Sequence, residues 1–392
     1  MRASRVRRPR LAAGACAAAL ALGVAACSDS GGASGDVPST GAGHVPSSRY
    51  TTPLKGICPD QVIVQAGWWP EIDDGFLYQL LGPNPTIDKG KNRVFGQLGG
   101  TGVTLEIRAG GPAVGFQPVS SLMAQDDDIL AGVVGMDEAV QHSGSQPTVA
   151  VFASYEKSPL AFIWGDPAWN FTSIADIGRA DAPVLASTGA AYLDVFEREG
   201  LLNSSRIDTS YQGDPARFVA ADGKIVQQAF ITNEPYRLQH DVKAWGKPVK
   251  YLLLGDEYPV YLPSLAVPAD KLTANRSCLG KLVPLFQQAQ RDYVTDPGPT
   301  NQLLLRAVAT LNTSGFTLSP GLLADGNAKQ KSLGLIANGK DGVLGSFDTA
   351  RVQKLIGQLT PVFEAKGTEP KPGLAPSDLA TNEFLDKSIS LG

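Results

Sequence analysis

The pattern that decides the fold is clearest in residues 214–245, DPARFVAADGKIVQQAFITNEPYRLQHDVKAW. The apolar run at 228–232 is typical of a buried strand, and it ends abruptly in a polar Asn-Glu-Pro sequence. The flanking segments 214–221 and 234–245 have the apolar spacing of helices. Strands that alternate with helices predict an α/β fold with mainly parallel sheets.

The same alternation runs along the 392-residue chain from about residue 60. A first series has expected strands at 61–66, 103–109, 129–135 and 148–153, with helices at 73–81, 118–124 and 136–142. A second series has expected strands at 160–164, 183–187, 206–211, 228–232 and 249–254, with further helices at 173–177 and 190–200. Two such series predict two lobes.

The chain changes character from about residue 268, where helical periodicity prevails. The expected helices lie at 270–294, 300–312, 347–365 and 375–389. We expect them to form a helical extension on the first lobe, because a bond between Cys58 and Cys278 would bring them back to it.

Cys58 and Cys278 are the two cysteines left in the body of the chain, and in an oxidising compartment they predict one disulfide. The alternative is two separate buried thiols. The bridge would return the C-terminal helices to the first lobe, so that two segments cross between the lobes and form a hinge. The predicted divisions are a signal peptide (1–26), a tether (27–57), lobe one (58–155 plus 258–392) and lobe two (156–257).

The N-terminus indicates export. MRASRVRRPR carries five Arg and no acid, and the apolar run that follows is shorter than the roughly 20 residues that a membrane span needs. The run ends in Val24-Ala25-Ala26-Cys27 before a Gly- and Ser-rich segment, which predicts lipidation of Cys27 and a flexible tether on the outer face of the cell membrane. The alternative is ordinary cleavage with an incidental Cys.

Charge excludes one class of partner. Without residues 1–26, Lys plus Arg falls from 34 to 29 against 38 Asp plus Glu, so the mature net charge is −9. No basic patch of the kind that binds nucleic acid remains. We therefore expect the lipid anchor alone to contact the membrane, and we expect a monomer.

Candidate ligand-binding residues follow the expected strands, because open α/β sheets bind ligands beyond the carboxyl ends of their strands. Trp68 and Trp69 follow the first strand and predict a stacking wall, although one could pack and the other cap the surface. Gly110 and Gly111 follow the second strand, where backbone N–H groups could approach a ligand or simply form a turn.

The second lobe contributes two further candidate sites. Ser187, Thr188 and Gly189 precede an expected helix, where they could hold an anion, serve as an ordinary cap, or both. Glu234 and Tyr236 open another helix, with Asn233 as its expected cap. A first-turn carboxylate favours the helix dipole, but Glu234 could also accept hydrogen bonds from an amine or amidine-like ligand.

Enzyme signatures are poor. The chain contains no GxSxG, HExxH, P-loop or GxGxxG motif, and its few His and Cys have no metal-ligand spacing. The acidic run at 126–128 is more typical of a solvated loop than of a metal site. The sequence therefore predicts a non-enzyme with no catalytic residue, metal or cofactor.

Taken together, these pieces resemble solute-binding lipoproteins of ABC importers, in the group that takes nitrate, alkanesulfonates, taurine and thiamine-pyrimidine precursors. The resemblance spans about residues 60–390 and rests on the order of the lipobox and four segments: GWWPEIDDGFLYQLLG (67–82), SYEKSPLAFIW (154–164), YQGDPARFVAADGKIVQQAFITNEPY (211–236) and ATNEFLD (380–386).

The resemblance implies a two-lobed periplasmic-binding fold of the second type, hinge closure on a small molecule, and delivery to ABC permease subunits. Within that group, Glu234 and the paired Trp favour a planar nitrogen heterocycle such as a pyrimidine or flavin precursor. Sulfonate, taurine or nitrate is the alternative within the same role. Two other readings place a secreted lipoprotein enzyme or a ligand sensor on the same fold.

Overall fold

The computed structural model describes residues 49–311, 313 and 315–392. The predicted signal peptide, Cys27 and most of the tether lie outside these residues. In the described part of the chain, no helix combines the length and the apolar character that crossing a membrane requires.

A seven-stranded sheet has the order β2-β3-β4-β1-β5-β12-β6. Its strands are β1 (Gln61–Gln65), β2 (Thr86–Asp88), β3 (Arg93–Gln97), β4 (Thr104–Arg108), β5 (Ile129–Val134), β6 (Thr148–Ala153) and β12 (Ser264–Pro268). Every residue of β5 and β6 is buried. Burial on both faces explains why these strands appear in the sequence as continuous apolar runs.

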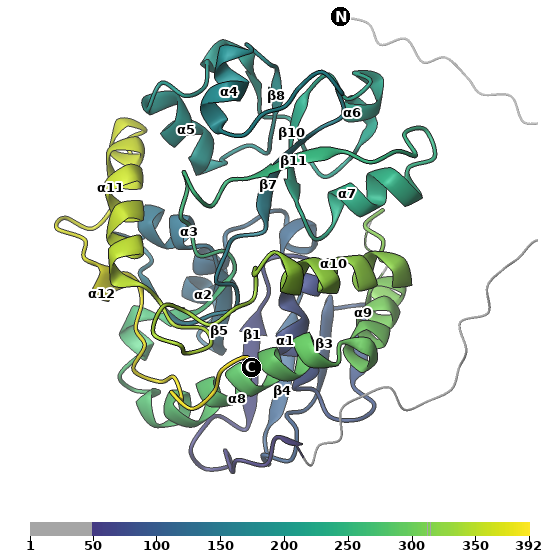
Figure 1. The fold of residues 1–392 in the computed structure, drawn as a ribbon. Coiled ribbons are helices and arrows are strands. Elements are labelled where there is room, and N and C mark those ends of the chain that lie inside the picture. The colour runs from purple at the N-terminus through teal and green to yellow at the C-terminus, as the bar shows by residue number, and fades with distance from the viewer. Residues whose placement is uncertain (1–48, 312, 314) are drawn as a thin grey trace, which may run out of the picture. The chain divides into compact units, whose positions relative to one another are not determined.

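A five-stranded sheet has the order β11-β7-β10-β8-β9 and forms the other part of the fold, drawn above the larger sheet in Figure 1. Its strands are β7 (Leu160–Trp164), β8 (Val184–Leu185), β9 (Ile207–Asp208), β10 (Val226–Phe230) and β11 (Lys250–Leu253). Both sheets contain parallel strands, which agrees with the α/β fold predicted from the sequence.

The sheets are mixed rather than mainly parallel. In the larger sheet β1 pairs in parallel with β4 and β5, whereas the remaining four pairings are antiparallel. In the smaller sheet two of four pairings are parallel. One reason is that β12 brings the chain back from the smaller sheet and therefore enters the larger one in the opposite direction, between β5 and β6. The sequence analysis did not identify β12 or the β2–β3 hairpin.

Helices cover both sheets. They are α1 (Gly75–Gln79), α2 (Val119–Gln125), α3 (Met136–Gln141), α4 (Ile174–Arg179), α5 (Ala191–Arg198), α6 (Ala216–Ala220), α7 (Glu234–Tyr236), α8 (Arg276–Thr295), α9 (Gly298–Leu311), α10 (Pro320–Ser332), α11 (Thr349–Ala365) and α12 (Pro376–Leu379). A short π-helical turn, Arg237–Asp241, continues α7, so this helical region ends four residues before the predicted 245.

The predicted helix at 375–389 is wrong beyond α12. Ala380 is extended and forms a bridge with Ala150, and the Thr381 N–H donates to the Ala150 carbonyl. Ala150 lies on β6, which is the edge strand of the larger sheet. The free edge of β6 therefore binds this segment in an extended conformation.

The predicted disulfide is confirmed. Cys58 and Cys278 are bonded, with their Cα atoms 4.8 Å apart. The bond joins the segment before β1 to the first turn of α8. Helices α8 and α9 also contact α1, so this part of the C-terminal extension packs on the larger sheet as predicted.

Helix α11 does not pack on the first lobe alone, as was expected of the C-terminal helices, because it contacts both α3 and α5. Tyr192 and Phe196 of α5 belong to the same apolar core as Phe162 of the smaller sheet. Figure 1 shows α11 running along the side of both parts of the fold. The C-terminal extension thus supports both sheets. The chain passes between the sheets in two segments, 154–159 and 254–263.

Candidate functional site

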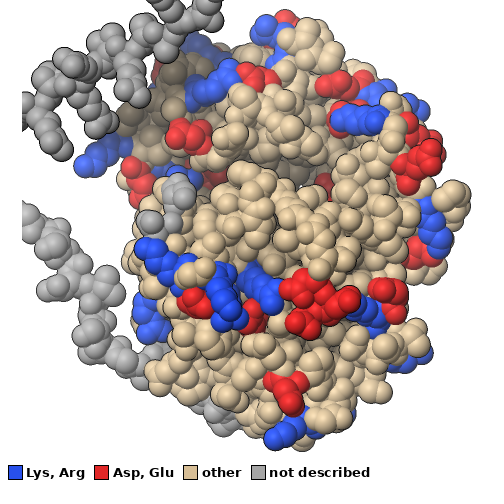
Figure 2. Space-filling model, turned by 180° about the vertical axis from the view of Figure 1, so that it is seen from behind, with Lys and Arg blue, Asp and Glu red and all other residues tan. Residues whose placement is uncertain are grey.

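The loop after β1 meets the loop after β10. Thr232 Oγ1 donates to the Asp73 carboxylate, at 3.1 Å from Oδ1 and 3.3 Å from Oδ2. Asp73 lies in a 3₁₀ turn before α1, and Thr232 follows β10 by two residues. Both side chains are buried. Figure 2 shows a groove across the back of the molecule, between its upper and lower parts, with acidic atoms in its depth.

Asp73 is the centre of a buried polar network. The Tyr155 hydroxyl donates to Asp73 Oδ1 at 2.5 Å, and Gln330 Nε2 of α10 donates to that hydroxyl at 2.6 Å. Burial raises the pKa of Asp73 to about 6, although the hydrogen bonds from Tyr155 and Thr232 oppose the shift. The network therefore joins the larger sheet, a connecting segment, the smaller sheet and α10 through one carboxyl group.

Glu234 accepts a hydrogen bond from the Phe230 N–H, which lies 2.7 Å from Oε2. The pairing of β8 with β10 stops at Gln227, so this N–H lies beyond the last ladder bond and the carboxylate takes it. The Tyr211 hydroxyl lies 3.5 Å from the other carboxylate oxygen. Burial raises the pKa of Glu234, while these hydrogen bonds and Arg237 oppose the shift.

Asn233 is not the cap that the sequence predicted. Its side chain makes no capping hydrogen bond, and its buried Oδ1 has no hydrogen-bond partner among the described residues. Glu234, in contrast, does stand in the first turn, as expected.

Glu71 adds a further carboxyl group to the same place. Burial raises the pKa of Glu71 well above its usual range, and the charges of Asp73, Asp74 and Glu234 raise it further. Burial and Asp73 together raise the pKa of Asp74 to about 7. Glu71 precedes Asp73 by two residues on the larger-sheet side, whereas Glu234 belongs to the smaller sheet. Acidic groups from both parts of the fold thus lie near one another, and each disfavours ionisation of the others.

The structure separates the two tryptophans. Trp69 is 4% exposed and packs against Ala109 and Leu311, with its indole N–H unpartnered among the described residues. Trp68 is only half-buried, and its ring centre lies 5.8 Å from that of Phe116. Of the pair, Trp68 is the one that keeps ring surface available for stacking.

Gly110 and Gly111 make room for the tryptophan loop. A Cβ on Gly110 would lie 2.2 Å from the Ala66 carbonyl oxygen, and one on Gly111 would lie 2.3 Å from the Trp68 ring. The Gly110 N–H already donates to the Trp68 carbonyl at 2.8 Å. Both glycines therefore have a packing role here, and the Gly110 N–H is not free for a ligand.

Ser187, Thr188 and Gly189 form a turn before α5 and do not cap it. The helix is preceded by Ala190, which makes no side-chain capping bond. The Ser187 N–H donates to Gln228 Oε1, and the Thr188 hydroxyl donates to the Thr209 carbonyl. These two donors already have acceptors within the smaller sheet and are not free for an anion.

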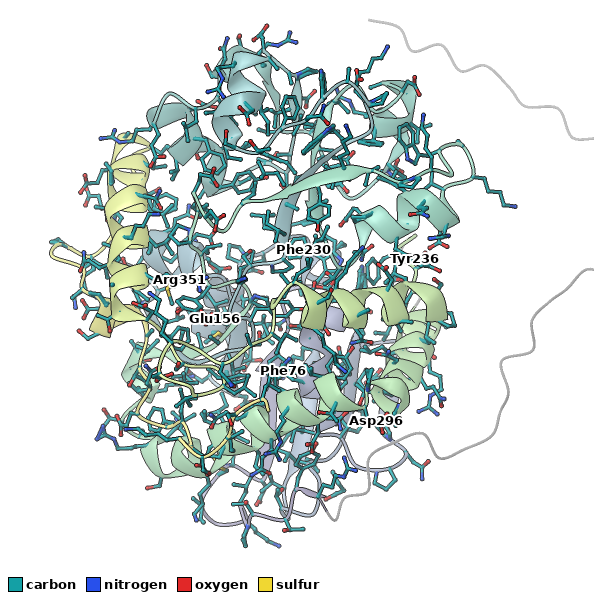
Figure 3. All side chains as sticks on the ribbon, in the orientation of Figure 1. Phe76, Glu156, Phe230, Tyr236, Asp296 and Arg351 are labelled. Carbon is teal, nitrogen blue, oxygen red and sulfur yellow. A yellow bond between two sulfur atoms is a disulfide. The ribbon has the colours of Figure 1, made fainter. Side chains whose placement is uncertain are left out.

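Tyr236 faces the C-terminal extension. A Cβ on Gly321 of α10 would lie 1.9 Å from the Tyr236 hydroxyl oxygen, and the Tyr236 ring stacks on His240 with centres 4.4 Å apart. Figure 3 shows Phe230 and Tyr236 on the side of the smaller sheet nearest α10. Tyr236 thus packs against α10 rather than toward an open site.

The sequence did not predict a role in the site for Asp73, Tyr155, Thr232 or Gln330. Thr232 had a usable signal, since it directly precedes the Asn-Glu-Pro sequence at a strand end. Asp73 was interpreted as part of a helix start. Gln330 carries no local signal, because α10 itself was not predicted.

Two other acidic or hollow regions lie apart from these residues. Asp126 pairs with Arg108 at 2.6 Å and Asp127 pairs with Lys271 at 2.9 Å. In the part of the chain that the structure describes, no three His, Cys, Asp or Glu side chains are arranged to hold a metal ion. A hollow of about 270 Å³ beside Arg108 and Lys91 contains none of the predicted site residues in its lining.

No protein-family model and no curated protein matches the chain. Among solved structures, the periplasmic aliphatic sulphonate binding protein SsuA from Escherichia coli is similar, with a TM-score of 0.53 and 14% identity over 80% of this chain and 90% of that chain. A putative periplasmic sulfonate-binding protein SsuA from Methylobacillus flagellatus gives 0.52 and 11%, over 83% and 92%. At this identity the likeness shows the fold, which is that of the two-lobed periplasmic binding proteins.

Proposed function

We propose that the protein is an extracytoplasmic solute-binding protein of an ABC importer. The fold supports this role, and its similar structures include proteins that are named for sulfonate binding. In this proposal the lobes are residues 58–155 plus 258–392 and residues 156–257, and a small ligand binds between them. The two connecting segments act as the hinge.

The proposed ligand is a planar nitrogen heterocycle that carries N–H donors or a positive charge. The observation that carries this proposal is that Thr232, from the loop after β10, bonds to Asp73, from the loop after β1, so that carboxyl groups of both loops, Glu234 and Glu71, gather there. Their mutual repulsion falls when a cation or several N–H donors lie between them. The half-exposed ring of Trp68 offers a surface on which such a ligand can stack.

A sulfonate or nitrate carries a negative charge, so it is less suited to a site that gathers acidic groups. In their ionised forms Glu71 and Glu234 repel an anion, and two donors of the 187–189 turn, the Ser187 N–H and the Thr188 hydroxyl, are already used within the smaller sheet. The acidic groove therefore favours the heterocycle over an anionic solute, although the similar structures are of sulfonate binders.

Export and anchoring belong to the same proposal. A signal peptide over 1–26 and a lipid on Cys27 would hold the protein at the outer face of the membrane, as a monomer that docks on permease subunits. Mass spectrometry of the N-terminal peptide from the native host tests this part, because lipidation adds a diacylglyceryl group to the Cys27 sulfur and cleavage before Cys27 removes residues 1–26.

A thermal-shift screen of the full chain tests the ligand class. The panel contains pyrimidines, flavins and cationic heterocycles on one side, and alkanesulfonates, taurine and nitrate on the other. A ligand at about 100 times its dissociation constant stabilises the folded state by about 2.7 kcal/mol. A shift with a heterocycle supports the proposal. A shift with anions alone keeps the importer role and overturns the ligand class, and no shift with any compound removes the support for binding.

A further inference from the structure

One arginine reaches both segments that connect the two sheets. Arg351 lies in the first turn of α11, and its Nη1 donates to the Glu156 carbonyl at 2.5 Å in segment 154–159. Its Nε and Nη2 donate to the carbonyls of Pro259 and Val260 in segment 254–263, both at 2.7 Å. Figure 3 shows Arg351 and Glu156 side by side at the level where the two parts of the fold meet.

The surroundings hold the guanidinium in this position. The Tyr261 ring lies beneath it, with the ring centre 3.7 Å from Cζ. The Tyr261 hydroxyl accepts the Asp348 N–H at 2.8 Å, and Asp348 in turn caps α11 by accepting the N–H groups of Ala350 and Arg351. Asp348 also forms an ion pair with Lys340. The first turn of α11, the Tyr261 ring and the Arg351 side chain therefore hold one another in place.

The chemistry of the contact suits a clamp. A guanidinium is planar and rigid, so it fixes the relative positions of the carbonyls that it binds, which a flexible lysine ammonium does not. The Arg351 side chain is only 15% exposed, and the Glu156 carboxylate lies 3.7 Å from Nη1. Hydrogen bonds from a charged donor in such a poorly solvated place are among the stronger ones in proteins.

Helix α11 extends the contact to the rest of both lobes. It packs against α3 beside the larger sheet and against α5 beside the smaller one. Any change of the angle between the sheets must alter the backbone of segments 154–159 and 254–263, because these alone connect the two sheets along the chain. Arg351 ties both segments to one helix.

We propose that Arg351 is a positioning residue of the interlobe hinge, and that its three carbonyl contacts favour the arrangement in which Asp73 and Thr232 are bonded across the groove. This inference rests on the proposed binding function, because hinge position matters to the protein through ligand binding. Loss of the clamp releases the two segments from each other. The ligand-free protein then spends less time in the arrangement seen here, and the apparent affinity falls with that fraction.

Single-molecule energy transfer measures the hinge without any ligand. Dyes are attached to unnatural amino acids at the exposed positions Lys89, in the larger lobe, and Lys224, in the smaller. The full chain is compared with Arg351→Lys and Arg351→Ala. The control is Arg276→Ala, which removes an arginine whose exposed ion pair with Glu383 lies away from both connecting segments.

The expected result is a longer and broader distance distribution for Arg351→Ala, an intermediate one for Arg351→Lys, and no change for Arg276→Ala. If the arrangement seen here falls to a tenth of the molecules, the apparent dissociation constant for any ligand found rises about tenfold. Unchanged distances in both Arg351 variants, with or without a fall in melting temperature, would mean a purely structural role and overturn the inference. A failed ligand search overturns the proposed function but does not alter this measurement.

Discussion

Glu234 combines a structural contact with an ionisable group at the end of β10. Its carboxylate accepts the Phe230 N–H at the point where β8 no longer pairs with β10. A neutral amide oxygen can accept the same bond. Burial raises the pKa of Glu234 and so disfavours its charge, which a cationic or N–H-donating ligand would restore.

Replacing Glu234 by Gln is expected to leave folding nearly intact and to weaken binding of the heterocycle. A hydrogen bond to a charged group contributes about 1.5–3 kcal/mol, so affinity should fall by roughly one to two orders of magnitude. Calorimetric titration measures the affinity, and thermal unfolding measures the stability. Glu364→Gln, at an exposed site on α11, is the matched control. Equal affinities for the two variants would show that Glu234 only completes the strand end.

Asp73 gives the folded protein a pH dependence. Its pKa is about 6 in the folded state, against about 3.9 for an unperturbed Asp. The folded state therefore binds a proton that the unfolded state has lost between these pH values. This contribution to stability is full below about pH 4 and is lost as the pH rises through 6, with Asp74, whose pKa is raised to about 7, acting in the same direction.

The Asp73→Asn variant is expected to flatten the stability curve between about pH 4 and 6. Two units of pKa correspond to about 2–3 kcal/mol at most. Urea unfolding of the wild type and the variant at several pH values tests this directly. The exposed Asp60→Asn substitution should leave the slope as it is. A wild-type curve that rises with pH over this window contradicts the assignment.

At the scale of elements, α10 approaches the smaller sheet closely at two glycines, Gly321 beside Tyr236 and Gly326 beside Thr232. A Cβ on Gly326 would lie 2.5 Å from Ile72 Cδ1 and 2.8 Å from the Thr232 carbonyl oxygen. Thr232 is one of the residues that bridge the groove, and its backbone cannot move independently of that contact. Helix α10 can therefore pack on both parts of the fold because Gly326 has no side chain at this contact.

Gly326→Ala is expected to destabilise the protein by about 1–3 kcal/mol, because overpacking outweighs the gain in helix propensity. Gly357→Ala in α11 is the matched control, since its Cβ would have no neighbour within 4 Å. The control should gain up to about 1 kcal/mol from propensity alone. Chemical denaturation of both variants measures the difference, and a stabilised Gly326→Ala would show that α10 is not tightly seated.

The disulfide joins two elements across a 220-residue separation. Removing it with the Cys58→Ser and Cys278→Ser pair is expected to lower stability by about 2–5 kcal/mol, because the unfolded chain regains the entropy of a long loop. Differential scanning calorimetry should show a lower melting temperature. A melting temperature unaffected by the double change would imply that α8 holds its place by packing alone.

At the scale of the whole molecule, binding between the sheets must affect both of them at once. We expect a ligand to slow amide hydrogen exchange in the loop 67–74 and in the loop 231–235 together. Exchange measured by mass spectrometry with and without the ligand decides the point. Protection of only one loop would place the ligand on one lobe and remove the case for closure.

The sequence predicted β5, β6 and β7 most clearly, because every residue of these strands is buried and they appear as uninterrupted apolar runs. It did not predict β12, whose apolar run is short and follows a connecting segment. It also missed α10, which has no marked apolar face, since it lies between parts of the fold. The sequence did not predict the extended segment after α12 either, because pairing with the edge strand β6 causes that conformation.

The sequence by itself determined the alternation of strands and helices, the pairing of Cys58 with Cys278, and the presence of a carboxylate at the end of β10. These follow from local periodicity, cysteine count and strand-end chemistry. Only the tertiary structure decided that Asp73 binds Thr232 and that Glu71 and Glu234 are gathered around this contact. Such contacts depend on where two separate sheets meet, and no local pattern encodes the position of one sheet relative to the other.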